Sequence, residues 1–220
     1  MGQYWHIALK KGNKTGKVEP HYFGAGSKFL EFAFSPHALK VLYKLLKEDW
    51  YDSQVAIVGD YCESDEGKET DEYDTISLLQ LDITEIDHRQ TSGFTKCDPE
   101  TFEKMGFARL KDSIKIRKDK FYVVNKTEKT YIVIGRKDYD TEECVAALLW
   151  ILIDDSSMGH GGGDIQPDKH SEHFIKHAGR WAYDSICILD DDDCLDSLKE
   201  YKLYSDFGSL MYELQYMSNY

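Results

Sequence analysis

The 220-residue chain contains few cysteines, and no two of them have the spacing of a metal-binding motif. The five cysteines include no Cys-x-x-Cys motif, and their odd number argues against a disulfide framework and against a cysteine-only zinc site. Long apolar runs are absent too, because the longest, residues 145–153, is about half of the ~20 residues that span a membrane. The first residues contain no basic-then-apolar secretory signal. These absences predict reduced thiols, a cytoplasmic location and no membrane partner.

Basic residues are also fewer than acidic residues. The 27 Lys and Arg residues stand against 40 Asp and Glu residues, which gives a formal net charge of −13. Such a surface repels phosphate backbones, so nucleic-acid binding is disfavoured. A basic protein partner remains compatible, because complementary charge speeds association. The alternative interpretation is that the acidity serves solubility alone.

The familiar signatures of catalysis are missing. The chain has no phosphate-binding loop, no dinucleotide fingerprint, no His-Glu-x-x-His helix and no Gly-x-Ser-x-Gly elbow. The acidic run at residues 190–193 lacks the spacing of a calcium-binding hand and is typical of a solvated turn. The sequence therefore assigns no catalytic residue. The first functional hypothesis is a non-enzymatic interaction module whose acidic surface binds another protein.

Periodicity and turn signals predict an α+β fold. Ser35 followed by Pro36 indicates a helix start, and Thr141 opens a strongly apolar helix. Short apolar or alternating segments predict strands, and a polar turn between two of them predicts a hairpin. The expected strands are residues 4–9, 55–58, 76–83, 121–124, 131–134 and 185–189. We expect a strand or extended segment at residues 28–34, an acidic surface loop at 63–74 and a short helix from Asp98. Residues 195–217 are expected to form a helical region that is broken near residues 206–208.

A weak internal repeat divides the chain. The segment from Trp50 to Asp60 aligns without gaps on the segment from Trp181 to Asp191, and an apolar helix is expected before each tryptophan. We interpret the chain as one compact domain of two similar αβ halves, about residues 1–110 and 111–220. Trp50 and Trp181 are then structural anchors in the core. Chance similarity of two short strands is the alternative.

Several motifs in shared order resemble a family of uncharacterised bacterial and phage proteins that begin Met-Gly-Gln-Tyr-Tyr. The resemblance implies a shared fold with a two-half layout, and it transfers no catalytic residues because the family has no established activity. Family members usually carry Arg where this chain has His160, so the resemblance gives His160 no role. The matching pieces are Met1-Gly2-Gln3-Tyr4-Trp5, Phe23-Gly24-Ala25-Gly26-Ser27-Lys28-Phe29-Leu30-Glu31, Gly59-Asp60-Tyr61, Tyr122-Val123-Val124-Asn125-Lys126-Thr127, Gly159-His160-Gly161-Gly162-Gly163-Asp164 and Gly179-Arg180-Trp181-Ala182.

A glycine-rich loop is the first candidate site. Gly161, Gly162 and Gly163 would let backbone N–H groups approach an anion closely, and Asp164 could orient water or a metal. The alternative is a flexible connector after a helix, with Gly159 as its C-terminal cap.

Half of the eight histidines lie close to this loop: His160, His170, His173 and His177. If residues 168–178 are helical, the last three share one stripe, and His173 and His177 at i, i+4 could share a zinc ion. Asp164 or His160 would supply further ligands. The second functional hypothesis is therefore a hydrolase-like, metal- or phosphate-binding enzyme, with zinc as its candidate cofactor. The alternative is a solvated polar helix face.

Overall fold

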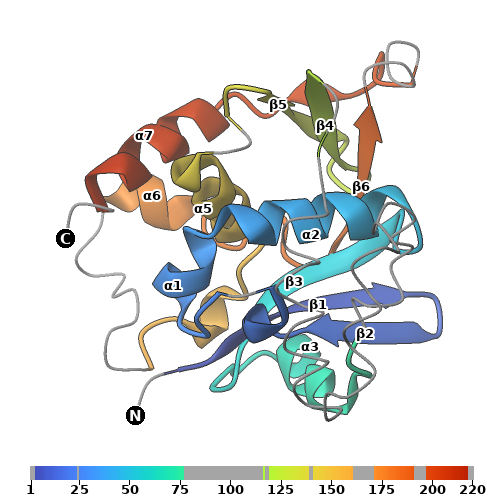
Figure 1. Ribbon diagram of the computed structural model, residues 1–220, viewed down its shortest axis with the longest axis vertical. Helices are drawn as coiled ribbons and strands as arrows, with labels where there is room; N and C mark the ends of the chain where they lie inside the picture. Colours follow the sequence, from blue (N-terminus) through green and yellow to red (C-terminus); the bar gives the residue numbers. More distant parts are fainter. Residues whose placement is uncertain are drawn as a thin grey trace, which may run out of the picture.

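The chain folds as a mixed seven-stranded sheet with helices packed against it (Figure 1). The computed structural model describes residues 3–23, 25–76, 116, 119–138, 141–160, 171–190 and 197–217. The strand order is β2-β1-β3-β6-β4-β5-β7, antiparallel except for the parallel β5–β7 pair. This arrangement confirms the predicted α+β class. The boundary expected near residue 110 lies outside the described residues.

The described elements have the following bounds. The strands are β1 Trp5–Lys11, β2 Lys14–Val18, β3 Ser53–Gly59, β4 Lys120–Asn125, β5 Thr130–Gly135, β6 Asp184–Asp190 and β7 Lys202–Leu203. The α-helices are α1 Phe29–Ala33, α2 Pro36–Lys47, α3 Asp65–Lys68, α5 Glu142–Ile151, α6 Glu172–Lys176 and α7 Phe207–Met217. Three 3-10 turns are η1 Pro20–Phe23, η2 Glu69–Glu72 and η5 Asp155–Ser157. None of these helices is long and apolar enough to cross a membrane.

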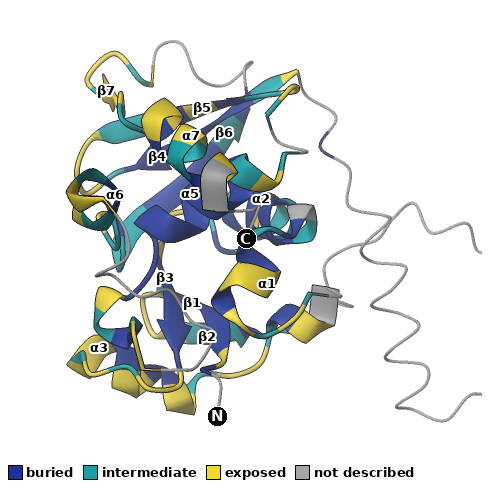
Figure 2. Cartoon of the chain, turned by 90° about the vertical axis from the view of Figure 1, so that its left-hand side faces the viewer, coloured by how far each residue is buried: buried dark blue, intermediate teal, exposed yellow. Residues whose placement is uncertain are grey.

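The main core lies between the sheet and the layer of α1, α2, α5 and α7. Alternate residues of β1 (Trp5, Ile7 and Leu9) face this layer together with Val55 and Ile57 of β3, as the period of two in a strand requires. Helix α5 lies at the centre, and all of its residues from Cys144 to Ile151 are buried (Figure 2). A helix that is apolar on every side is stable only when other elements surround it.

The opposite face of β1 and β3 carries a second, smaller cluster of apolar residues. Ala8, Ala56 and Val58 pack beneath Cys62, Tyr73 and the turn that precedes β6. Helix α3 and turn η2 cover this face, so the prediction of a plain surface loop at residues 63–74 was wrong. Ser64 Oγ caps α3 by accepting a hydrogen bond from Gly67 N at 3.0 Å.

The two central strands pair symmetrically. In the β3–β6 ladder Ser53 lies opposite Ile186, Gln54 opposite Ser185, and Val55 opposite Asp184. In the gap-free alignment of residues 50–60 on 181–191, Gln54 aligns with Ser185, so the ladder is centred on one aligned pair. On one side of this central pair, β1 lies next to β3 and β2 lies next to β1. On the other side, β4 lies next to β6 and β5 lies next to β4.

Two further predictions of secondary structure need correction. Residues 28–34 were expected to be a strand or an extended segment, but Phe29–Ala33 form the short helix α1, with Phe29, Phe32 and Ala33 buried on one side. Glu31 stabilises the start of this helix by accepting a hydrogen bond from Lys28 N at 3.2 Å. Residues 195–217 contain one described helix, α7, preceded by the two-residue strand β7. Apart from Ile76, the strand expected at residues 76–83 and the helix expected from Asp98 lie outside the described residues.

Candidate metal centre

Helix α6 and its C-cap residue carry two of the predicted histidines, His173 and His177. Ser171 caps the helix, because its Oγ accepts a hydrogen bond from Phe174 N at 3.0 Å. Phe174 is buried and stacks on Trp150 of α5, with ring centroids 4.1 Å apart. Trp150 Nε1 in turn donates to the carbonyl oxygen of Phe174 at 2.9 Å. These contacts fix the short helix, so the side chains on its other side have a defined position.

His173, His177 and Asp206 form the histidine–aspartate cluster. One potential ligand atom from each residue lies within 4.8 Å of the other two. The two imidazole rings have centroids 4.7 Å apart, as expected for i, i+4 neighbours on one helical side. Asp206 comes from the start of α7, which lies beside α6 (Figure 1), and its Oδ2 is 4.0 Å from His177 Nε2.

A second set of contacts orients both imidazoles through their Nδ1 atoms. His173 Nδ1 lies 2.7 Å from Glu213 Oε1, and Ser171 Oγ donates to the other oxygen of the same carboxylate at 2.6 Å. His177 Nδ1 lies 2.5 Å from the Tyr204 hydroxyl. In the tautomer with the proton on Nδ1, each ring donates outward and keeps its Nε2 lone pair for a metal. Carboxylate–histidine pairs of this kind support the ligands of many metal sites.

The electrostatic environment favours the neutral form of His177. Burial, together with neighbouring His173, lowers the pKa of His177, although Asp206 opposes this shift. Burial and the charge of Asp206 raise the pKa of Tyr204 to about 12, so its hydroxyl keeps its proton at neutral pH. A neutral imidazole is the form that binds a metal, and a protonated tyrosine oxygen can still accept the Nδ1 hydrogen.

Only part of the predicted site comes together. His160 lies elsewhere, with its Nε2 3.1 Å from the Ser156 carbonyl and 3.9 Å from Glu63 Oε1. The predicted residues Gly161, Gly162, Gly163, Asp164 and His170 lie outside the described residues. Of the two structural anchors, Trp50 is 3% exposed and Trp181 is 1% exposed, and Trp181 packs edge-on against Tyr204.

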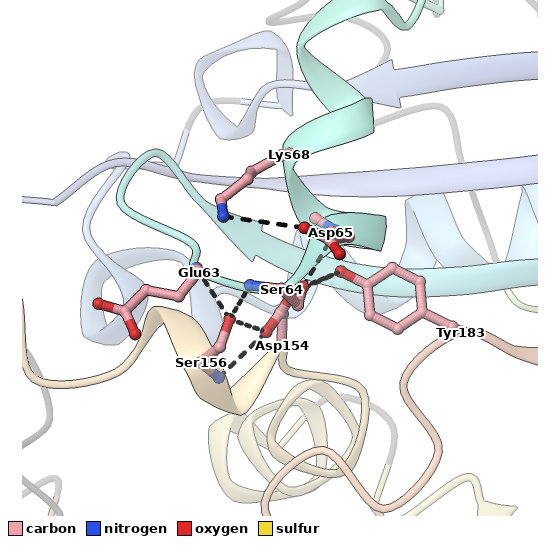
Figure 3. Close-up of polar contacts among 8 residues, drawn as sticks. Glu63, Ser64, Asp65, Lys68, Asp154, Ser156 and Tyr183 are labelled. Carbon is pink, nitrogen blue, oxygen red and sulfur yellow. Dashed lines mark hydrogen bonds and ion pairs between the residues drawn. The ribbon is translucent and has the colours of Figure 1, made fainter.

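A second polar group surrounds the buried carboxylate of Asp154, which lies in the turn that follows α5 (Figure 3). Asp154 Oδ2 accepts hydrogen bonds from the hydroxyls of Ser64 and Tyr183. Its Oδ1 accepts from Ser156 N at 3.0 Å and from Ser156 Oγ at 2.6 Å. These four donors are all neutral, and they join α3, η5 and the turn before β6. We interpret this group as a structural latch, because its donors already satisfy the carboxylate.

The described thiols do not favour nucleophilic catalysis. Burial raises the pKa of Cys144 to about 12. The pKa values of Cys62 and Cys187 are also raised, again chiefly by burial. A thiol with a raised pKa carries little thiolate at neutral pH, and the thiolate is the nucleophile.

Sequence reasoning missed Asp206, Tyr204 and Glu213. His173 and His177 carry a spacing signal, whereas the other three residues lie on a separate segment and follow no motif. The sequence contains only one hint, because Asp206 precedes the helical residues of α7 and acids are common at that position. Comparison of the chain with protein-family models, with curated proteins and with solved structures gives no match.

Proposed function

We propose that the protein binds a zinc ion at His173, His177 and Asp206 and uses it to activate water for a hydrolytic reaction. One observation carries the proposal: three ligand atoms lie within 4.8 Å of one another, and the Nδ1 atoms of both histidines are engaged elsewhere. In tetrahedral zinc sites with bonds of about 2.0–2.1 Å, neighbouring ligand atoms are about 3.4 Å apart. Small rotations of the partly exposed side chains of His173 and Asp206 would bring the ligand atoms from within 4.8 Å to this tetrahedral separation.

The ligand set points to a catalytic zinc over a purely structural one. Structural zinc sites have four protein ligands, whereas catalytic sites have three and keep a fourth position for water. Among the described residues, two imidazoles and one carboxylate give three. A zinc ion held there would lower the pKa of its bound water to roughly 7 and so supply hydroxide at neutral pH. Within the chain, Glu213 and Tyr204 would hold the two imidazoles in the ligating orientation.

The proposal is tested by equilibrium zinc binding to protein purified without chelator. Wild type should bind one zinc ion per chain in competition with a chromogenic chelator. His177→Ala should lose most of this binding, because it removes the most buried ligand. His21→Ala is the matched control, since it removes an exposed histidine outside the cluster. Equal zinc affinity in all three proteins would contradict the proposal, and circular dichroism would verify that each variant is folded.

The protein-interaction module is a second proposal. It is favoured by the net charge of −13 and by a hollow above β1 and β3 whose lining includes Glu66 and Glu69. It predicts that a basic protein copurifies with the chain at near-physiological salt. A clean monomer without a partner would count against it. The cytoplasmic location and the resemblance to the Met-Gly-Gln-Tyr-Tyr family also stay predictions.

We also propose that the chain arose by duplication of one αβ unit. The symmetric β3–β6 register supports this, as does the sheet order, in which β2-β1-β3 mirrors β5-β4-β6. Equivalent turns support it too: Asp52 and Tyr183 occupy the same place in the aligned segments, and both have a φ of 63°. Separate expression of residues 1–110 and 111–220 gives a test, because related halves should reassociate through β3 and β6. Failure of the two halves to associate when mixed would count against this proposal.

A further inference from the structure

A hollow of about 260 Å³ lies on the sheet face that α3 and η2 cover. Ala8 and Ala56 form its base, because both line it and both are buried. Tyr73 and Tyr183 also line it, and its remaining lining residues are Leu9, Lys10, Gln54, Glu66 and Glu69. This volume is below the 300–1,000 Å³ typical of small-molecule sites, so the hollow suits one long side chain better than a larger ligand. It shares no residue with the histidine–aspartate cluster.

Comparison of the two halves explains why this hollow exists. Ala8 and Ala56 are direct cross-strand partners in the β1–β3 ladder. At the equivalent positions of the β4–β6 ladder, Val124 is the partner of Cys187. Val124 and Cys187 are buried in an apolar cluster of their own. The first half thus carries two methyl groups where the second half carries larger side chains, and the smaller volume leaves space above the sheet.

Tyr183 is held in place before any ligand arrives. Its hydroxyl donates to Asp154, and its carbonyl oxygen accepts from Gln54 Nε2 at 3.1 Å. Its backbone N–H donates to the carbonyl of Val55 at 2.7 Å. Because three hydrogen bonds already hold Tyr183, this residue would lose little conformational entropy when a ligand binds, which favours affinity.

The charges around the hollow favour a cation. Glu66 and Glu69 are both exposed, and Lys10 lies 3.8 Å from Glu69, so one carboxylate is in excess at the rim. Burial and the charge of Glu69 raise the pKa of Tyr73. Burial and the hydrogen bond to Asp154 raise the pKa of Tyr183. The whole chain, with a net charge of −13, carries the same sign of charge as this rim.

We propose that this hollow binds the guanidinium group of an arginine side chain presented by a basic protein partner. A guanidinium can stack on aromatic rings and pair with a carboxylate at the same time. Tyr73 and Tyr183 supply the rings, and Glu66 supplies the carboxylate. The long apolar stem of arginine would pass over the alanine methyl groups while its charged end stays near the rim.

The test uses acetyl-arginine amide as the probe and the ¹³C-labelled methyl groups of Ala8 and Ala56 as reporters in NMR. We expect saturable shifts of both methyl signals, with a dissociation constant on the order of 1 mM, as suits a single side chain. Acetyl-citrulline amide has nearly the same shape without the charge and should bind about tenfold more weakly. An arginine-containing basic peptide should bind more tightly than the free probe, and added salt should weaken it.

Two variants test the site itself. The double variant Ala8→Val and Ala56→Cys places the residues of the second half in the first and fills the hollow. It should weaken arginine binding more than tenfold. Calorimetry measures the affinity of this variant for the probe. Glu66→Gln should weaken binding about threefold, as for a partly exposed ion pair, and does not depend on the core. Glu72→Gln is its control, because this exposed glutamate lies on η2 but does not line the hollow.

Three results would overturn the proposal: no shift of the alanine methyl signals, equal affinity for citrulline and arginine, or full binding in the folded double variant. If the double variant does not fold, equal affinities in wild type and Glu66→Gln would overturn the proposal by themselves. Zinc binding should be the same in wild type and in the double variant, so failure at the hollow and failure of the metal proposal can be told apart.

Discussion

Asp52 and Tyr183 share an unusual backbone conformation, each with a φ of 63°. Each lies two residues after a buried tryptophan and directly before one of the two central strands. The two turns also contact each other's strands. Ser185 Oγ donates to Asp52, and Gln54 Nε2 donates to the Tyr183 carbonyl. The left-handed conformation is uncommon for residues other than glycine, so its presence before both central strands indicates a shared structural requirement.

The backbone at Asp52 predicts different costs for two substitutions. Asn tolerates the left-handed region, so Asp52→Asn should lose less than about 1 kcal/mol, chiefly from the exposed pair with Lys126. Val is β-branched and tolerates this region poorly, so Asp52→Val should lose about 2 kcal/mol or more. Urea denaturation of the two variants and the wild type measures the difference. Equal losses in the two variants would indicate that side-chain contacts alone matter at this turn.

Strong local signals explain which elements the sequence could predict. Ser35 is the N-cap of α2, with Pro36 at its first position, and the side chain of Thr141 caps α5, both as expected. The hairpin of β4 and β5 also follows its turn signal. These signals depend on neighbouring residues only, so they can be detected without tertiary information.

The missed elements depend on contacts between distant residues. Helix α3 needs Gly67, because a Cβ there would lie 2.5 Å from Asp154 Oδ2, and no local pattern shows that contact. The candidate metal centre likewise combines residues that the sequence could predict with one that it could not. The spacing of His173 and His177 identified two candidate ligands, whereas Asp206 is brought close to them by the packing of α7 on α5. The predicted partner His160 instead contacts the segments near Asp154.

The Asp154 latch predicts a large loss of stability for one substitution. Asp154→Ala would leave the hydroxyls of Ser64, Ser156 and Tyr183 without their shared acceptor, and we expect a loss of about 3 kcal/mol. Tyr183→Phe removes a single donor and should lose about 1.5 kcal/mol. Thermal or urea unfolding measures both. Asp155→Ala is the control, since Asp155 is exposed and should change stability by less than about 0.5 kcal/mol. A similar small loss for all three would contradict the latch.

The buried His6 predicts how stability depends on pH. Burial and the charge of Lys17 lower the pKa of His6 to about 4, although Asp71 opposes the shift, and its Nε2 lies 3.2 Å from Thr70 Oγ1. In the unfolded chain the pKa is near 6.5. Below that pH the unfolded state binds a proton that the folded state does not, so the free energy of unfolding falls as pH decreases from 6.5 to 4. Above pH 6.5 this penalty is absent.

The size of the effect can be measured with one variant. Protonation of His6 in the unfolded chain should lower the free energy of unfolding by about 2 kcal/mol at pH 5 relative to pH 7. His6→Gln keeps a polar side chain beside Thr70 but does not titrate, so its stability should fall by about 2 kcal/mol less than that of the wild type between these two pH values. Urea unfolding at pH 7 and pH 5 gives both differences. Parallel losses in the two proteins would contradict a buried, neutral His6.

The last prediction separates the metal ligands from the residues that position them. Zinc at 100 times its dissociation constant should stabilise the wild type by about 2.7 kcal/mol, and His177→Ala should abolish this gain. Tyr204→Phe keeps the ring that packs on Trp181 but removes the oxygen beside His177 Nδ1. It should therefore weaken zinc binding roughly tenfold or more.

The stability of the metal-free protein decides how such a result is interpreted. If Tyr204→Phe weakens zinc binding while the metal-free variant unfolds at nearly the same urea concentration as the wild type, the hydroxyl acts by orienting His177. If zinc binding and metal-free stability fall together, Tyr204 supports the fold in general and its positioning role is excluded. Glu213→Gln allows the same comparison at His173, because Gln keeps an acceptor for Nδ1 without the negative charge. We expect Glu213→Gln to weaken zinc binding less than Tyr204→Phe does, since only the latter removes the acceptor altogether.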